Sequence, residues 1–121
     1  MTRLLTREQQ KTLDGRFCTL TGLPSVLLME QAASGMSGMI AEIVNAFDDE
    51  RVAYDAVYFT GAGNNGGDGW ASARQLMASG YRVAVFDVYP DRELSGDAAI
   101  NREAYRRLGG EVITDPALLP G

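Results

Sequence analysis

The feature that most constrains the fold is a glycine-rich segment placed between a strand-like segment and a helix-like one. Glycine occupies positions 61, 63, 66, 67 and 69. Upstream, Val52–Thr60 is rich in β-branched and aromatic residues and predicts a buried strand. Downstream of the expected loop Gly61–Gly69, a helix is predicted from about Trp70 to Ser79, ended by Gly80 in a left-handed conformation. This order is typical of the first half of a βαβ unit, and therefore of a parallel sheet.

Two helices are predicted ahead of this strand. The first covers about Arg7–Arg16, with Thr6 as N-cap and Gln9 as its capping-box partner. After a glycine–proline break, Ser25 is expected to cap a second helix that ends near Phe47. Apolar residues three or four positions apart predict the buried stripe of this second helix: Met29, Ala33, Met36, Ile40, Ile43 and Phe47.

Two further strands and one helix are predicted toward the C-terminus. Tyr81–Tyr89 predicts a strand, a helix begins at Ser95 or Asp97, and Glu111–Thr114 predicts a short third strand. Helices that alternate with strands favour right-handed βαβ connections. The fold class predicted for residues 1–121 is therefore α/β, a Rossmann-like three-layer αβα domain with a mainly parallel sheet.

The composition excludes several kinds of site. The chain has no histidine and one cysteine, Cys18, so it cannot hold a histidine base, an internal disulfide or a multi-cysteine zinc site. A formal net charge of −5 argues against nucleic acid as a partner. The polar start of the chain shows no secretory signal, and apolar runs such as Val26–Met29 are too short to span a membrane. We therefore expect a cytoplasmic protein without a nucleic-acid or membrane partner.

The glycine-rich segment predicts an anion-binding turn. Gly61, Gly63 and Gly66 have the G-x-G-x-x-G spacing, and bare backbone N–H groups at a helix N-terminus bind phosphate. The Walker A alternative fails because Gly67 stands where that motif needs lysine. This spacing by itself is a weak signal, because a tight strand-to-helix turn also explains it.

The polar residues within this segment make it more specific. Asn64 and Asn65 offer amide donors and acceptors. Two roles stay open for Asp68, which could cap the following helix or accept hydrogen bonds from ligand hydroxyl or amide groups.

Gly63–Gly69 reads GNNGGDG, which resembles the signature of the NAD(P)H-hydrate epimerase domain, also called the YjeF N-terminal domain. Leu28–Ala33 is similar to the L-M-E-x-A-G segment of that family, with Ala33 in place of its glycine. Leu94–Ala98 and Asn101 are similar to the family's next helix. The resemblance covers most of the chain in a consistent order.

The resemblance implies epimerisation of hydrated NADH and NADPH (NADHX and NADPHX, R to S) in nicotinamide cofactor repair. It implies a homodimer and a functional link to an NAD(P)H-hydrate dehydratase. It also implies that Asn65 helps to coordinate a potassium ion through oxygen, and it identifies no catalytic residue within this chain. The implied substrate-binding residues are Asn64, Asn65, Gly66, Gly67 and Asp68.

The family pattern continues with further strands, a second glycine-rich loop and a D-x-P-S-G segment, none of which lies within Met1–Gly121. The resemblance therefore predicts that this chain carries the N-terminal portion of the domain only, with an incomplete fold. By itself the chain is not expected to be a competent epimerase.

Two other functions stay open. One is a non-catalytic ligand-binding or dimerisation module, because relatives of this domain occur in mRNA-decapping scaffolds and in an apolipoprotein-binding protein. The other is an NAD-dependent oxidoreductase, in which Asp87 would hold the adenosine ribose. Asp87 follows Gly61 by slightly more than the usual spacing of about 20 residues. An alternative for Asp87 is a strand end that faces water.

Overall fold

The computed structural model describes residues 6–47, 52–61, 64–91 and 93–120, with side chains at all of these positions except 7 and 64–66. Every helix and strand expected from the sequence is present. In chain order the elements are α1 (Arg7–Thr21), α2 (Ser25–Ala46), β1 (Ala56–Thr60), α3 (Asn64–Ala78), β2 (Val83–Asp87), α4 (Gly96–Arg107), β3 (Glu111–Ile113) and a 3₁₀ turn (Pro116–Leu118).

The sheet has the order β1-β2-β3, and both pairs of strands are parallel. Tyr58 lies opposite Val85, which lies opposite Val112. Helices α3 and α4 make the two crossovers between these strands. The predicted α/β class with a parallel sheet is therefore confirmed.

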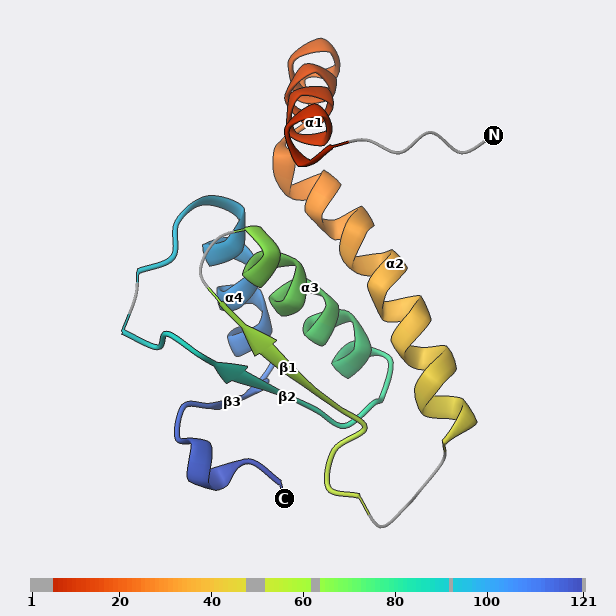
Figure 1. The fold of residues 1–121 in the computed structure, drawn as a ribbon, viewed down its shortest axis with the longest axis vertical. Helices are drawn as coiled ribbons and strands as arrows, with labels where there is room; N and C mark the ends of the chain where they lie inside the picture. The colour runs from red at the N-terminus through yellow and green to blue at the C-terminus, as the bar shows by residue number, and fades with distance from the viewer. Residues whose placement is uncertain (1–5, 48–51, 62–63, 92, 121) are drawn as a thin grey trace.

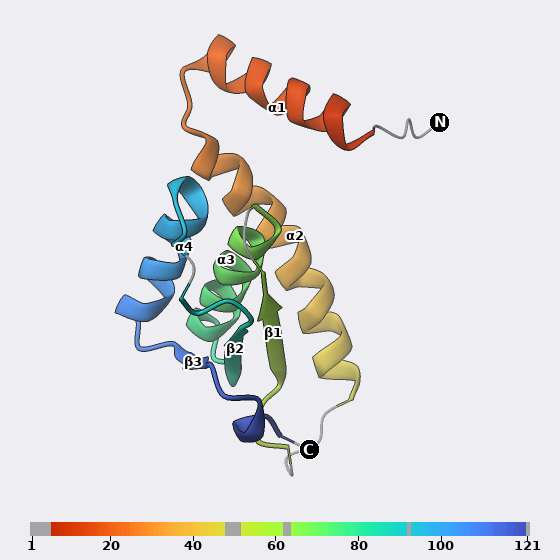
Figure 2. The same cartoon turned by 60° about the vertical axis from the view of Figure 1, so that its left-hand side comes forward.

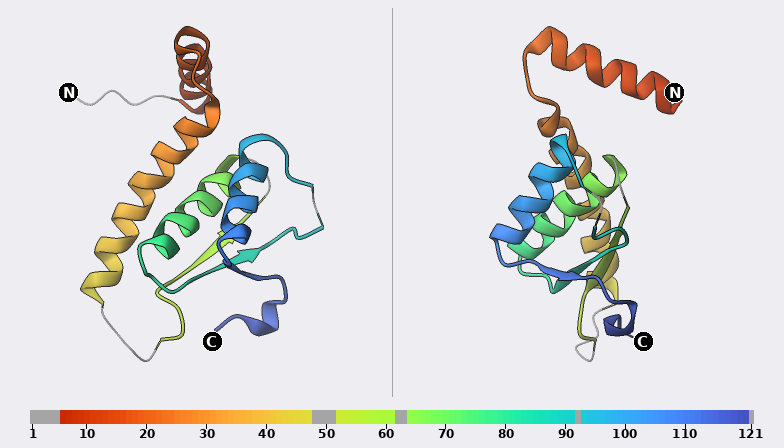
Figure 3. Two further views of the ribbon diagram at one scale, coloured as in Figure 1. Left: turned by 180° about the vertical axis from the view of Figure 1, so that it is seen from behind. Right: turned by 90° about the vertical axis from the view of Figure 1, so that its left-hand side faces the viewer.

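One face of the sheet carries the core. Seen from behind, α3 and α4 lie in front of the strands, and α2 packs beside α3 on the side of β1 (Figure 3). Buried side chains from both layers meet there: Tyr58, Val83 and Val85 of the sheet with Trp70, Ala73, Leu76 and Tyr105 of the helices. Within the described ranges no helix covers the opposite face at β1, so two of the three expected layers are present.

Helix α1 projects from this α/β body and packs mainly on α2 (Figure 2). The predicted capping box is confirmed, since the Thr6 hydroxyl accepts from the Gln9 N–H and the Gln9 side chain accepts from the Thr6 N–H. The helix runs past the predicted end at Arg16 to Thr21, where Gly22 stops it with a φ of 71°.

One expectation for α2 is wrong and another is confirmed only in part. The N-cap is Pro24 without a side-chain bond, because the Ser25 hydroxyl donates to the Asp97 carboxylate of α4 instead. The predicted buried stripe also holds only in part. Met29 and Ala33 are buried, whereas Ile43 is 57% and Phe47 77% exposed. The end of the helix extends past its contacts with the core, which periodicity by itself does not reveal.

The predicted strands are longer than the observed ones, because the pattern of apolar residues continues beyond the hydrogen-bonded ladder. Strand β1 begins at Ala56 rather than Val52, and the Asp55 carboxylate before it accepts from the Arg82 backbone N–H and guanidinium. These bonds hold the pKa of Asp55 below its usual value. Gly80 ends α3 with a φ of 94°, as predicted.

Candidate functional site

The glycine-rich segment is mostly helix rather than loop. Strand β1 ends at Thr60 and α3 begins at Asn64, so the prediction of a loop over Gly61–Gly69 and a helix from Trp70 is wrong. Residues 62 and 63 lie outside the described part of the chain. Glycine costs about 1 kcal/mol in a helix relative to alanine, which is why the sequence pattern favours a loop here. Close packing overrides that preference.

Gly67 and Gly69 let α3 approach its neighbours. A Cβ built on Gly67 would stand 2.6 Å from Cε of Met29 and 3.1 Å from Cα of Ala98. One built on Gly69 would stand 3.1 Å from Cγ2 of Thr60. Neither glycine has a positive φ. In the described structure these two glycines therefore leave room for helices to pack closely, whereas the sequence suggested that glycine was needed for backbone freedom.

Three helices begin beside one another at this point. Met29 of α2, Gly67 of α3 and Ala98 of α4 all lie near the start of their helices and are in contact. Figure 1 shows these first turns together, at the end of the sheet where β1 and β2 finish. The positive ends of three helix dipoles therefore face the carboxyl edge of a parallel sheet, the edge where such folds bind ligands.

Side-chain hydrogen bonds hold these helix ends together. Asn101 is buried, and its amide Nδ2 lies 3.1 Å from the Met29 sulfur and donates to the Asp97 carbonyl at 3.1 Å. The Ser25 hydroxyl donates to the Asp97 carboxylate. Sequence reasoning placed Asn101 only by family resemblance and missed this three-helix junction, because its contacts join residues far apart in the chain.

Asp68 is the candidate ligand group whose side chain is described. It is the fifth residue of α3, so the hypothesis that it caps the helix is wrong. Partial burial raises the pKa of its carboxyl group. Among the residues that the structure describes, none donates a hydrogen bond to it.

The other predicted contact residues lie in the first turn of the same helix. Asn64, Asn65 and Gly66 open α3, and the side chains of the two asparagines lie outside the described part. Gly67 is buried in the helix junction. The ligand roles assigned to residues 64–68 therefore stay predictions, and the structure brings their backbone to the strand end where the sequence placed it.

Asp87 lies beside this edge but does not face water, so that expectation is wrong. It stands opposite Thr60 in the sheet register and is 5% exposed, because it points to the face that α3 and α4 cover. Its Oδ1 accepts from the Tyr89 N–H at 3.2 Å. Its Oδ2 is buried without a partner among the described residues.

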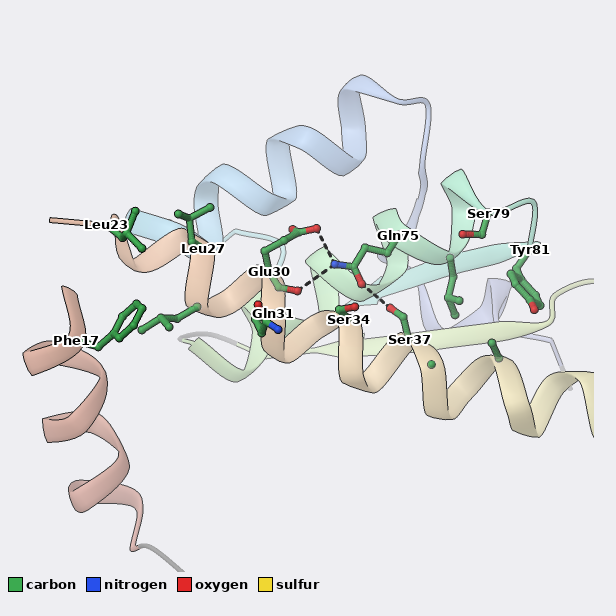
Figure 4. A pocket seen from close by; sticks show the side chains of 14 residues that line it. Phe17, Leu23, Leu27, Glu30, Gln31, Ser34, Ser37, Gln75, Ser79 and Tyr81 are labelled. Carbon is green, nitrogen blue, oxygen red and sulfur yellow. Dashed lines mark hydrogen bonds between the residues drawn. The ribbon is translucent and has the colours of Figure 1, made fainter. Parts of the chain in front are cut away.

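A separate open groove of about 1000 Å³ lies between α1, α2 and α3 (Figure 4). None of residues 64–68 lines it. Polar groups in and beside it bind one another. The Ser37 hydroxyl lies 2.8 Å from Oγ of Ser72 and donates to Oε1 of the Gln75 side chain, while the Gln75 side-chain amide donates to the Glu30 carboxylate. Arg74 forms an ion pair with Glu30. We interpret this network as a structural contact that stabilises the packing of α2 against α3.

Two kinds of feature are missing from the described ranges. There, no three histidine, cysteine, aspartate or glutamate side chains come together as a metal site would need. No helix there is long and apolar enough to cross a membrane.

Comparison with known proteins identifies the family. The model of the YjeF-related protein N-terminus family matches residues 25–120. The chain belongs to this family. The matched residues take in α2 through β3, including the three-helix junction, and leave out α1. The resemblance seen in the GNNGGDG segment is therefore confirmed.

Relatives carry two names. The chain is 35% identical over 111 residues to the NAD(P)H-hydrate epimerase of Rhodobacter capsulatus, covering 90% of this chain and 52% of the relative. It is 44% identical over 87 residues to the bifunctional NAD(P)H-hydrate repair enzyme Nnr of Salinibacter ruber, covering 72% of this chain and 15% of the relative. It is 33% identical over 110 residues to the Nnr of Moorella thermoacetica, covering 91% and 20%. The chain thus spans about half of the epimerase and a fifth or less of these bifunctional enzymes.

Proposed function

We propose that this chain forms the cofactor-binding part of an NAD(P)H-hydrate epimerase, which interconverts the R and S forms of NADHX and NADPHX for repair. The observation that carries the proposal is the GNNGGDG segment, which opens α3 at the carboxyl edge where three helix N-termini meet. Family membership and the names of the relatives support it.

The helix ends suggest how the dinucleotide is oriented. Backbone N–H groups in the first turn of α3 bind the pyrophosphate, so that an acidic chain can hold an anion without lysine or arginine. The Asn64 and Asn65 amides and the Asp68 carboxylate then bind sugar hydroxyl groups or the carboxamide of the ring.

The reaction needs little covalent chemistry from the protein. The C6–O bond of the hydrated ring breaks as the nitrogen lone pair moves in, and the departing hydroxide takes a proton to become water. Water then adds to C6 from the other face and gives a proton back. One acid/base group is required. We assign this step to none of residues 64–68.

The proposal extends to a bound potassium ion, to the oligomeric state and to the location in the cell. Asn65 contributes one amide oxygen to a potassium ion, a hard cation that takes oxygen ligands. The described residues do not complete such a site, and no reaction step is assigned to the ion. We also propose a homodimer, a functional link to a dehydratase like the one in the bifunctional relatives, and a cytoplasmic location where the reduced cofactors are used.

Titration calorimetry with NADHX tests the proposal. We expect saturable binding, weakened about tenfold or more by Asp68→Asn, because a hydrogen bond to a charged group is lost. Asp14→Asn, on the projecting α1, is the matched control and should bind as the unchanged chain does. Equal binding by the Asp68→Asn variant would contradict the assigned role of this carboxylate. The same affinity in potassium and sodium buffers would remove the ion from the proposal.

Intact NAD distinguishes the alternatives. An oxidoreductase would bind NAD much more tightly than NADHX, and a non-catalytic dimerisation module would bind neither. The structure disfavours the oxidoreductase, because the carboxylate of Asp87 is buried beneath α3 and α4 rather than open to a ribose.

A further inference from the structure

Asp87, the last residue of β2, has a buried carboxylate with a hydrogen bond on one oxygen only. It shares the strand face of Val83 and Val85, toward α3 and α4, and is 5% exposed. Its Oδ1 accepts from the Tyr89 N–H at 3.2 Å, whereas Oδ2 has no partner among the described residues. Buried polar groups are normally paired, and an unpaired one weakens the fold. The presence of such a group is explained if its charge acts on a ligand.

Asp87 lies beside the start of the glycine-rich segment. It is opposite Thr60 in the register of β1 and β2, so the two Cα atoms are about 5 Å apart. The Val88 N–H donates to the Thr60 carbonyl at 3.1 Å and holds the two strand ends together. Thr60 directly precedes this segment, and its side chain lies against Gly69 of α3. Asp87 is therefore at the carboxyl edge where the proposed function places the pyrophosphate (Figure 1).

The side-chain charges at this edge are mainly negative. The first four residues of α2, α3 and α4 contain no lysine or arginine, and Asp68 and Asp97 add carboxylates in the first turns of α3 and α4. The connection from β2 to α4 adds Asp91 and Glu93. It also contains Arg92, which lies outside the described residues. In the part of the chain that the structure describes, the positive potential at this edge therefore comes from helix N-termini, each equivalent to roughly half an elementary charge.

Burial makes the charge of Asp87 effective at a distance. An exposed carboxylate is screened by water and salt over roughly 10 Å, whereas a buried one is screened much less. NADPHX differs from NADHX by a phosphate on the 2′-oxygen of the adenosine ribose, which adds a charge of about −1.5 to −2. That ribose is joined to the pyrophosphate, so the added phosphate stays near the same edge. The buried carboxylate therefore opposes NADPHX more strongly than NADHX.

We propose that Asp87 determines specificity by making the site prefer NADHX to NADPHX. The inference rests on the proposed function and names the substrate that the site prefers. Asp87 acts by repulsion through the protein and touches neither the ribose nor the phosphate, because its carboxylate is covered. In Rossmann folds an acidic residue near the end of this strand contacts the ribose directly, and burial excludes that contact here.

Titration calorimetry with NADHX and with NADPHX tests the inference. We expect the unchanged chain to bind NADHX about tenfold or more tightly than NADPHX. Asp87→Asn keeps the shape of the side chain and removes its charge, so it should bring the two dissociation constants to within about twofold, mainly by tightening NADPHX. Asp87→Ser, which is smaller and also neutral, should do the same. A loss of folded protein lowers the stoichiometry for both ligands but not the ratio of their dissociation constants.

Glu103→Gln is the matched control, because it removes one negative charge from a side chain of α4 that is 56% exposed. It should leave the preference unchanged, since water screens that charge. Equal binding of the two ligands by the unchanged chain overturns the inference and leaves the proposed function standing. A preference that both Asp87 variants retain also overturns it, as does tighter binding of NADPHX, which Arg92 would favour. Binding of neither ligand overturns the proposed function and the inference with it.

Discussion

Gly67→Ala tests whether the signature glycine is needed for helix packing, apart from any ligand. The added methyl carbon would stand 2.6 Å from Cε and 2.8 Å from the sulfur of Met29, and 3.1 Å from Cα of Ala98. The methionine side chain can move, but its sulfur is the contact of the buried Asn101 amide. The Ala98 backbone cannot move without shifting α4. Both responses therefore cost stability.

The magnitude follows from opposing effects. Overpacking costs roughly 1–3 kcal/mol, and disturbing the Asn101 contact costs about 1 kcal/mol more. Alanine recovers about 1 kcal/mol of helix propensity. We expect a net loss of about 2 kcal/mol in the free energy of unfolding, or roughly 5–10 °C in Tm for a chain of this length.

The assay is urea unfolding followed by circular dichroism, without ligand. Gly38→Ala in α2 is the matched control, because nothing lies within 4 Å of its added carbon. That variant should gain up to about 1 kcal/mol. In a Met29→Ala background, Gly67→Ala should cost clearly less than by itself. A Gly67→Ala variant as stable as the unchanged chain would refute the packing argument and leave ligand approach as the reason for the glycine.

Three further predictions concern buried polar groups. In urea unfolding, Ser72→Ala should lower the free energy of unfolding by about 2 kcal/mol and Tyr58→Phe by about 1 kcal/mol. The first loss is larger because Ser72→Ala leaves the buried Tyr58 hydroxyl without its partner at 2.8 Å. Equal losses in the two variants would contradict this hydrogen bond. Asp68→Asn should raise Tm at neutral pH. Burial raises the pKa of Asp68 in the folded state, so its carboxyl group loses its proton at a higher pH in the folded state than in the unfolded state. The charged carboxylate therefore costs stability at neutral pH, and the gain in Tm from Asp68→Asn should shrink toward low pH. Tyr105→Phe should reduce the loss of stability between pH 10 and pH 12. Burial raises the pKa of Tyr105 from 10.0 to about 12, so the unfolded chain ionises first as the pH rises and the folded state loses stability. If the free energy of unfolding of Tyr105→Phe fell with pH as steeply as that of the unchanged chain, Tyr105 would be excluded as the cause.

The local features of the fold could be predicted because they depend on neighbours in sequence. The Thr6–Gln9 capping box and the left-handed Gly80 follow from backbone geometry within a few residues. Alternating helix and strand patterns likewise predicted the parallel sheet. The family signature at residues 63–69 was readable for the same reason, as a short contiguous motif.

The start of α3, the direction of Asp87 and the purpose of Gly67 could not be predicted, because each depends on which helices pack together. Local propensity makes Gly66–Gly69 look like a loop, whereas contacts with Met29, Ala98 and Thr60 hold Gly67 and Gly69 in a helix. The sequence by itself determined the order of elements and the residues of the candidate ligand turn. Only the tertiary structure decided that three helix ends meet at that turn and that, among the described residues, no helix covers the outer sheet face at β1, since both result from contacts between residues distant in the chain.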